Sequence, residues 1–135
     1  MRMKSQKIKV LIADDHDLVR QGLKQILELE EDIEVIGLAV DGEDTIKQAE
    51  KLQPHIILLD INMPRMNGIQ ALRRLKDIGI DSKVIMLTIH DDREYLLETI
   101  NTGASGYVLK DAESYSLIQA IRTVYKGESY IHPSL

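Results

Sequence analysis

The chain has 135 residues, 44% of them hydrophobic and 29% charged, which predicts one domain that folds on its own rather than a disordered segment. Its formal net charge of −5 excludes the electrostatics of a nucleic-acid-binding surface, so we expect any contact with DNA to come from another domain. Cysteine is absent, which excludes disulfides and thiolate metal sites, and no signal peptide or long apolar segment is evident, so a cytoplasmic location is expected.

Short apolar runs alternate with segments of helical periodicity along the whole chain. The runs predict strands at 8–13, 33–40, 55–59, 84–88 and 106–109. Apolar residues recur at helical spacing within 18–27, 42–52, 69–76, 96–100 and 117–124. This alternation predicts an α/β fold, a five-stranded parallel sheet flanked by five helices, since five such units are too few for a closed eight-stranded barrel.

Polar residues follow the ends of four predicted strands. Asp14 and Asp15 follow the first, Asp60 the third, Thr88 ends the fourth and Lys110 follows the fifth. Open parallel sheets bind ligands at the carboxyl ends of their strands. We therefore expect these side chains to meet at one edge of the sheet.

Three carboxylates at one edge repel one another unless they take up a proton or bind a cation. An all-oxygen ligand set from Asp14, Asp15 and Asp60 favours Mg²⁺ or Mn²⁺ over zinc. A carboxylate with such a cation beside it can attack phosphorus and form an aspartyl phosphate, with Lys110 neutralising the transferred oxygens and Thr88 donating a hydrogen bond to them. Each of these residues alone is also explained by a helix cap, a turn or a surface position.

This order of residues, with Asp60-Ile61-Asn62-Met63-Pro64 and Gly68 behind it, resembles the CheY-like receiver domain of response regulators over nearly the whole chain. The resemblance implies a doubly wound, flavodoxin/CheY-like fold with strand order 2-1-3-4-5. It also implies that the domain is a regulatory phosphoacceptor, catalysing only its own phosphorylation and dephosphorylation, rather than an enzyme acting on other substrates.

The resemblance assigns a role to each site residue. It implies that Asp60 accepts a phosphoryl group from a sensor histidine kinase. It implies direct Mg²⁺ ligands from Asp15, Asp60 and the backbone carbonyl of Asn62, with Asp14 reaching the ion through water. Thr88 and Lys110 would hold the phosphoryl oxygens, and Tyr107 matches the switch aromatic, expected to turn inward when Thr88 moves.

Two further segments narrow the resemblance. Residues 107–111 and 127–133 resemble the NarL/FixJ subfamily, and Thr88-Ile89-His90-Asp91-Asp92 is similar to its DegU-like members. The subfamily continues into a LuxR-type helix-turn-helix, so we expect residues 1–135 to be a receiver domain of a transcription regulator, with 127–135 beginning the linker. A natural stand-alone receiver is the alternative.

Phosphorylation is expected to shift the balance between two conformational states of the domain. The output surface is expected to be the face formed by the fourth helix, the fifth strand and the fifth helix, and a homodimer is the expected consequence.

One feature departs from the pattern of receiver domains, and other interpretations of the same residues are disfavoured. Most receivers have proline after the lysine, with a cis peptide, whereas this chain has Asp111, which leaves the local geometry open. A HAD-like phosphohydrolase is disfavoured because its motif needs an acid where Asn62 stands, and a phosphate-independent interaction module because the acidic set is complete. The basic cluster Arg73, Arg74 and Lys76 is interpreted as a solvated helix face.

The histidines are further candidates for phosphate donors, general bases or metal ligands. None of the four, at positions 16, 55, 90 and 132, has a supporting partner at ligand spacing in the sequence. His90, two residues past Thr88, is predicted to lie near the mouth of the site and to tune how fast water attacks the phosphoryl group.

Overall fold

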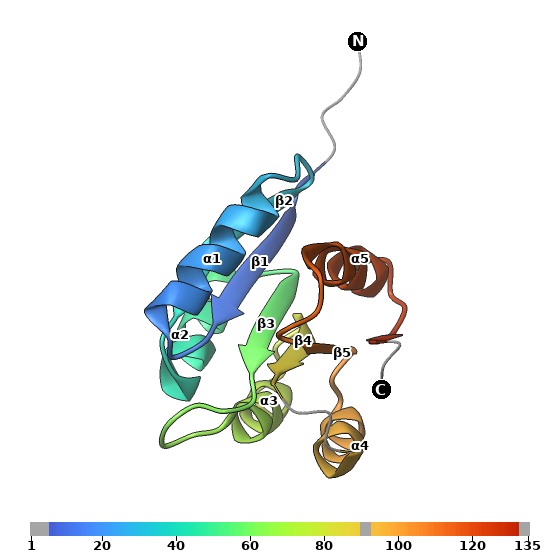
Figure 1. Cartoon of the computed structure of the whole chain (residues 1–135). Helices are drawn as coiled ribbons and strands as arrows, with labels where there is room; N and C mark the ends of the chain where they lie inside the picture. The colour runs from blue at the N-terminus through green and yellow to red at the C-terminus, as the bar shows by residue number, and fades with distance from the viewer. Residues whose placement is uncertain (1–5, 90–92, 133–135) are drawn as a thin grey trace.

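A computed structural model describes residues 6–89 and 93–132 of the chain, and these form an α/β domain (Figure 1). Strands and helices alternate as the sequence predicts, and a short strand follows the last helix. In chain order the elements are β1 Ile8–Ala13, α1 Asp17–Glu28, β2 Ile33–Ala39, α2 Gly42–Leu52, β3 Ile56–Asp60, α3 Gly68–Asp77, β4 Lys83–Thr88, α4 Arg93–Thr102, β5 Gly106–Leu109, α5 Ser114–Tyr125 and β6 Tyr130–Ile131.

Within the described residues the strands form one sheet in the order β2-β1-β3-β4-β5-β6, with every neighbouring pair parallel. The predicted order 2-1-3-4-5 is confirmed, and β6 extends it at one edge. The strand order reverses beside β1, and ligands are therefore expected there.

None of the helices among these residues is long and apolar enough to cross a lipid bilayer.

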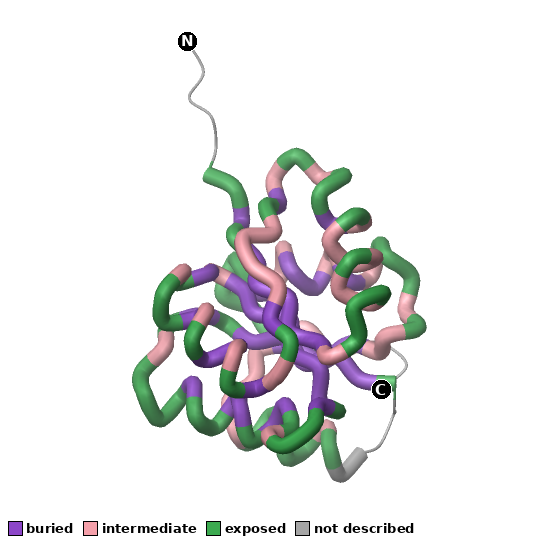
Figure 2. The backbone as a smooth tube through the Cα atoms, turned by 90° about the vertical axis from the view of Figure 1, so that its left-hand side faces the viewer, coloured by how far each residue is buried: buried purple, intermediate pink, exposed green. Residues whose placement is uncertain are grey.

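The sheet is buried on both faces, because helices cover each of them. On one face α2 and α3 pack on side chains such as Leu11 and Leu59, and on the other α1 and α5 pack on Val10 and Leu58. Figure 2 shows the central strands as a buried interior surrounded by half-buried and exposed helices. The uninterrupted apolar run 56–59 in β3 is explained by this burial, since neither face of the strand meets water.

Helical periodicity predicted the helices better than it predicted their buried sides. Leu18 in α1 is 87% exposed and Leu97 in α4 is 54% exposed, although both belong to the periodic apolar sets. The first helix begins directly after His16. His16 is its N-cap residue, without a side-chain cap, and Asp17 lies in its first turn.

β6 is the main addition to the predicted fold. Its first residue, Tyr130, donates its backbone N–H to the carbonyl of Ser105 at 3.0 Å, and His132 donates to that of Tyr107 at 3.0 Å. Gly106 pairs with Tyr130 in register. Two paired residues are too few to show a period in the sequence, so this strand was missed.

The connection from β3 to α3 is fixed by a close backbone approach at Gly68. Its N–H donates to the carbonyl of Ile61 at 2.8 Å, and a Cβ atom at this position would collide with the backbone carbonyl of Asp60. The helix that follows is closed by a capping box between Asn67 and Gln70. The backbone behind Asp60 is thereby held in place.

We expect Gly68→Ala to lower the free energy of unfolding by about 1 to 3 kcal/mol, because the added methyl group must displace the backbone behind Asp60. Urea denaturation measures this change. Gly22→Ala is the matched control: nothing lies within 4 Å of the added Cβ in α1, so it should stabilise the protein by about 0.5 to 1 kcal/mol. Equal effects of the two substitutions would contradict this account of Gly68.

Candidate functional site

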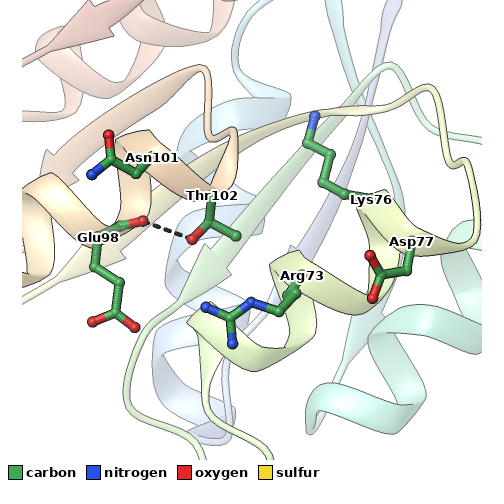
Figure 3. A pocket seen from close by; sticks show the side chains of 6 residues that line it. All are labelled: Arg73, Lys76, Asp77, Glu98, Asn101 and Thr102. Atoms are coloured by element: carbon green, nitrogen blue, oxygen red, sulfur yellow. Dashed lines mark hydrogen bonds between the residues drawn. The ribbon is translucent and has the colours of Figure 1, made fainter.

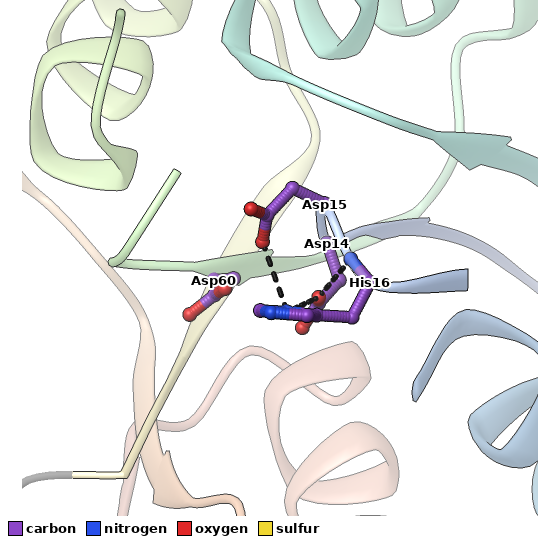
Figure 4. Close-up of side chains that lie close together, drawn as sticks. All are labelled: Asp14, Asp15, His16 and Asp60. Atoms are coloured by element: carbon purple, nitrogen blue, oxygen red, sulfur yellow. Dashed lines mark hydrogen bonds and ion pairs between the residues drawn. The ribbon is translucent and has the colours of Figure 1, made fainter. Parts of the chain in front are cut away.

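Three carboxylates converge at the carboxyl ends of β1 and β3, as predicted. Ligand atoms of Asp14, Asp15, His16 and Asp60 all lie within 4.8 Å of one another (Figure 4). The side chains of Asp14 and Asp60 are 0% and 1% exposed, while that of Asp15 is 28% exposed. We call these four residues the acidic pocket, and its open side is at Asp15 and His16.

Lys110 joins two of these carboxylates from the end of β5. Its Nζ lies 2.6 Å from Oδ2 of Asp14 and 3.0 Å from Oδ2 of Asp60. The lysine is itself largely buried, with 16% of its side chain exposed. Its charge is therefore placed where it can offset two buried negative charges with little screening by water.

Burial raises the pKa of Asp60, and although Lys110 opposes this shift, the nearby Asp14 charge adds to it. Burial alone would lower the pKa of Lys110, but the hydrogen bond that Lys110 donates to Asp14 and the charge of Asp60 outweigh it and raise this pKa. The pocket therefore holds a firmly protonated lysine beside a carboxylate that is costly to ionise.

The donor set of the acidic pocket fits a divalent cation. Oδ1 of Asp15 and Oδ2 of Asp60 are buried atoms that make no hydrogen bond among the described residues. They do lie at ion-pair distance from His16 and Lys110, at 3.1 Å and 3.0 Å, but without hydrogen-bond geometry. Three carboxylates against one lysine leave an excess of negative charge, which a divalent cation would neutralise.

The remaining predicted residues lie on β4 and β5 or directly after β3. Asn62 donates its backbone N–H to Oδ1 of Asp60 at 3.1 Å. Thr88 is fully buried at the end of β4, and its carbonyl accepts the backbone N–H of Lys110 at 2.7 Å. Tyr107 has an inward, fully buried side chain in the core on the α2 and α3 face. The Lys110–Asp111 peptide is trans, like every other peptide bond in the described ranges.

The prediction that no histidine has a supporting partner is wrong for His16. Its Nδ1 lies 3.2 Å from Oδ1 of Asp14 and 3.1 Å from Oδ1 of Asp15. Its position directly after two aspartates at a strand end was the available signal. His55 has a different role at the opposite end of the sheet, where its Nδ1 accepts the backbone N–H of Lys9 at 2.9 Å. His90 lies outside the described residues.

A hollow of about 600 Å³ lies between α3 and α4 (Figure 3). Basic, acidic and uncharged polar residues line it: Arg73, Lys76, Asp77, Glu98, Asn101 and Thr102. Within it Thr102 donates its hydroxyl to the backbone carbonyl of Glu98 at 2.7 Å. Arg73 and Lys76 are exposed and have acidic neighbours, which agrees with the interpretation of this cluster as a solvated helix face.

The fold and the acidic pocket together define a class of protein, a doubly wound α/β domain with carboxylates and a lysine gathered at the carboxyl edge of a parallel sheet. Residues 10–122 match the family model described as response regulator receiver domain, and the chain belongs to that family.

The relatives agree with this assignment and with the predicted subfamily. The chain is 46% identical over 129 residues to the transcriptional regulatory protein DegU of Brevibacillus brevis, covering 96% of this chain and 55% of DegU. It therefore spans about half the length of this curated relative.

Solved receiver structures have the same architecture. The receiver domain of NarL from Mycobacterium tuberculosis superposes with a TM-score of 0.88 at 29% identity, covering 92% of this chain and 100% of that one. The isolated receiver domain of RcsB from Salmonella enterica serovar Typhimurium, in the presence of the phosphomimetic BeF₃⁻, gives a TM-score of 0.87 at 28% identity, covering 96% of both chains. The predicted CheY-like fold is confirmed.

Proposed function

We propose that this receiver domain takes a phosphoryl group from a sensor histidine kinase onto Asp60. The observation that carries the proposal is the contact of Lys110 with both Asp14 and Asp60 inside the acidic pocket. In the reaction a carboxylate oxygen of Asp60 forms a bond to phosphorus. The bond from phosphorus to the kinase histidine nitrogen breaks, and its electron pair stays on the imidazole.

The residues around Asp60 have distinct roles in this proposal. Lys110 stabilises the negative charge on the transferred oxygens, since it is held beside Asp60 at 3.0 Å. The Asn62 N–H bonds Oδ1 of Asp60, which orients the carboxylate. The hydroxyl of Thr88, at the adjacent strand end, donates to a phosphoryl oxygen and so responds to its presence.

A divalent cation, Mg²⁺ or Mn²⁺, is part of the proposal. Asp15, Asp60 and the carbonyl of Asn62 would bind it directly, with Asp14 reaching it through water. When bound, the ion neutralises charge on the phosphoryl oxygens and on the carboxylates that hold it. The buried oxygens of Asp15 and Asp60 that lack hydrogen bonds support this assignment.

The signal is proposed to leave through α4, β5 and α5, by a shift between two states and by dimerisation. Because the chain spans about half of DegU, control of transcription by a following DNA-binding domain is a proposal for the longer protein. Residues 127–135 are proposed to begin the linker to that domain, and β6 lies within them. The cytoplasm remains the predicted location.

Incubation with acetyl phosphate, with and without Mg²⁺, tests the phosphorylation directly. Intact-mass spectrometry should find one added phosphoryl group per chain in the presence of Mg²⁺ and none after chelation with EDTA. Size-exclusion chromatography of the same samples reports dimerisation. The absence of any mass gain with Mg²⁺ would contradict the proposed function.

We also expect phosphorylation to change the attachment of β6, because Tyr130 and His132, the residue after β6, donate backbone hydrogen bonds to Ser105 and to the proposed switch residue Tyr107. Two such bonds are worth roughly 1 to 3 kcal/mol, so a modest shift of Tyr107 is enough to alter them. Hydrogen exchange at the Tyr130 and His132 amides should change at least about threefold on addition of BeF₃⁻ and Mg²⁺. The amide of Lys9, at the opposite end of the sheet, is the control. Unchanged exchange at both of these amides would contradict a coupling between β6 and the phosphorylation site.

A further inference from the structure

His16 places an imidazole nitrogen against the acidic pocket. Figure 4 shows the ring beside the carboxylates of Asp14 and Asp15, with Asp60 nearby. Its backbone N–H also donates to Oδ1 of Asp14 at 2.8 Å, which holds the residue at the start of α1. The position of the ring thus follows from the turn that links β1 to α1.

The distances in this group suit shared coordination of one ion. Nδ1 of His16 lies 3.2 Å from an Asp14 oxygen and 3.1 Å from an Asp15 oxygen. Adjacent ligands around an octahedral ion with bonds of about 2.1 Å are separated by about 3.0 Å. Asp60 contributes a further oxygen within the 4.8 Å span of the group. Small movements would bring the ligand atoms of Asp15, His16 and Asp60 around a common ion, with Asp14 reaching it through water.

The His16 ring is also available for coordination. Its side chain is 67% exposed, and within the part of the chain that the structure describes its polar contacts are to Asp14 and Asp15. Turning the ring to face an ion therefore costs no other hydrogen bond in those residues. The sequence predicted an all-oxygen ligand set, and in the structure a ring nitrogen of His16 lies beside those oxygens.

Imidazole nitrogen distinguishes between divalent cations. Mg²⁺ prefers oxygen ligands and keeps much of its water, whereas affinity for nitrogen rises from Mn²⁺ through Co²⁺ to Ni²⁺. We propose that His16 is a nitrogen ligand that makes this pocket selective for Co²⁺ and Ni²⁺ over Mg²⁺. The inference rests on the proposed function, because it uses the same pocket, and it adds a second class of metal ion to that site.

Calorimetric titration of the whole chain with CoCl₂ and with MgCl₂ tests the proposal, using wild type, His16→Gln and His55→Gln. We expect His16→Gln to weaken Co²⁺ binding at least about tenfold and Mg²⁺ binding by less than about twofold. His55→Gln removes an imidazole at the other end of the sheet and should leave the affinities for both ions unchanged. Unchanged Co²⁺ affinity in His16→Gln, or equal losses for both ions, would overturn the proposal.

Electron spin echo measurements on bound Mn²⁺ provide an independent readout. Nitrogen coupling from a ligating imidazole should be present in wild type and absent from His16→Gln. A spectrum without nitrogen coupling in wild type would overturn the assignment of His16 as a ligand. Binding of Mg²⁺ and BeF₃⁻ by the same samples distinguishes the proposed function from the proposed role of His16. If Mg²⁺ and BeF₃⁻ bind normally while the His16 tests fail, only the role of His16 is contradicted. If no divalent cation binds, the metal site that the proposed function requires is contradicted as well.

Discussion

Replacing Asp60 with asparagine is expected to abolish phosphorylation by acetyl phosphate, because an amide lacks the carboxylate oxygen that must attack phosphorus. The mass gain seen for wild type with Mg²⁺ should fall below detection, a loss of at least about a thousandfold in rate. Asp81→Asn is the control, since Asp81 is an exposed carboxylate outside the pocket and its loss should leave labelling unchanged. A mass gain that persists in Asp60→Asn would place the acceptor elsewhere.

The same substitution is expected to stabilise the fold at neutral pH. Burial raises the pKa of Asp60, so the folded state binds this proton more tightly than the unfolded chain does. The stability that this proton contributes is complete below about pH 4 and is lost as the pH rises through the raised pKa. Asparagine does not titrate, so the Tm of Asp60→Asn should rise above that of wild type over that pH range. A Tm below that of wild type at pH 7 would contradict the unfavourable burial of this charge.

Replacing Lys110 with methionine has the second large expected effect. Methionine keeps much of the length of the side chain but leaves Asp14 and Asp60 facing each other with almost no exposure to water. Breaking a buried charge cluster in this way should cost about 3 kcal/mol in the free energy of unfolding at pH 7. Urea denaturation measures the loss, and added Mg²⁺ should restore part of it by replacing the missing positive charge.

Arg122→Gln is the matched control for this prediction. Arg122 also contacts two carboxylates, Glu30 at 2.9 Å and Asp32 at 2.8 Å, but its side chain is 36% exposed. Water and salt screen such a surface cluster, so its loss should cost less than about 1 kcal/mol. If Lys110→Met proves no more costly than Arg122→Gln, the buried lysine does not hold the pocket together.

Lys110→Met should also bind Mg²⁺ more tightly while being phosphorylated more slowly. Removing the positive charge beside Asp14 and Asp60 removes repulsion toward the ion, yet it also removes the group that neutralises the phosphoryl oxygens. Opposite changes in Mg²⁺ affinity and labelling rate, each about tenfold or more, would show that Lys110 opposes Mg²⁺ binding but promotes phosphoryl transfer. A parallel loss of both would mean that the substitution disrupts the pocket as a whole.

The sheet and the convergence of its polar ends were predictable because they follow from local patterns. Runs such as 56–59 are apolar without interruption only when both faces are covered, and parallel strands bring their carboxyl ends to one edge. Asp14, Asp60 and Lys110 meet there for that reason, although they are far apart in the chain.

Other features depend on tertiary packing that no local pattern encodes. β6 consists of two residues held by backbone hydrogen bonds, so its side chains carry no periodic signal. Leu97 belongs to an apolar helical set but is exposed, because which side of α4 meets the sheet is decided by packing. The contacts of His16 depend on the turn after β1 and on the orientation of its ring, which sequence spacing cannot specify.

A crystal structure of the domain with Mg²⁺ and BeF₃⁻ is the most direct test of the central claim, that a cation-neutralised carboxylate carries the phosphoryl group. The account predicts beryllium bonded to a carboxylate oxygen of Asp60, with Mg²⁺ between Asp15 and Asp60 and a fluorine near Lys110. Beryllium on any other side chain, or Mg²⁺ outside the acidic pocket, would contradict it.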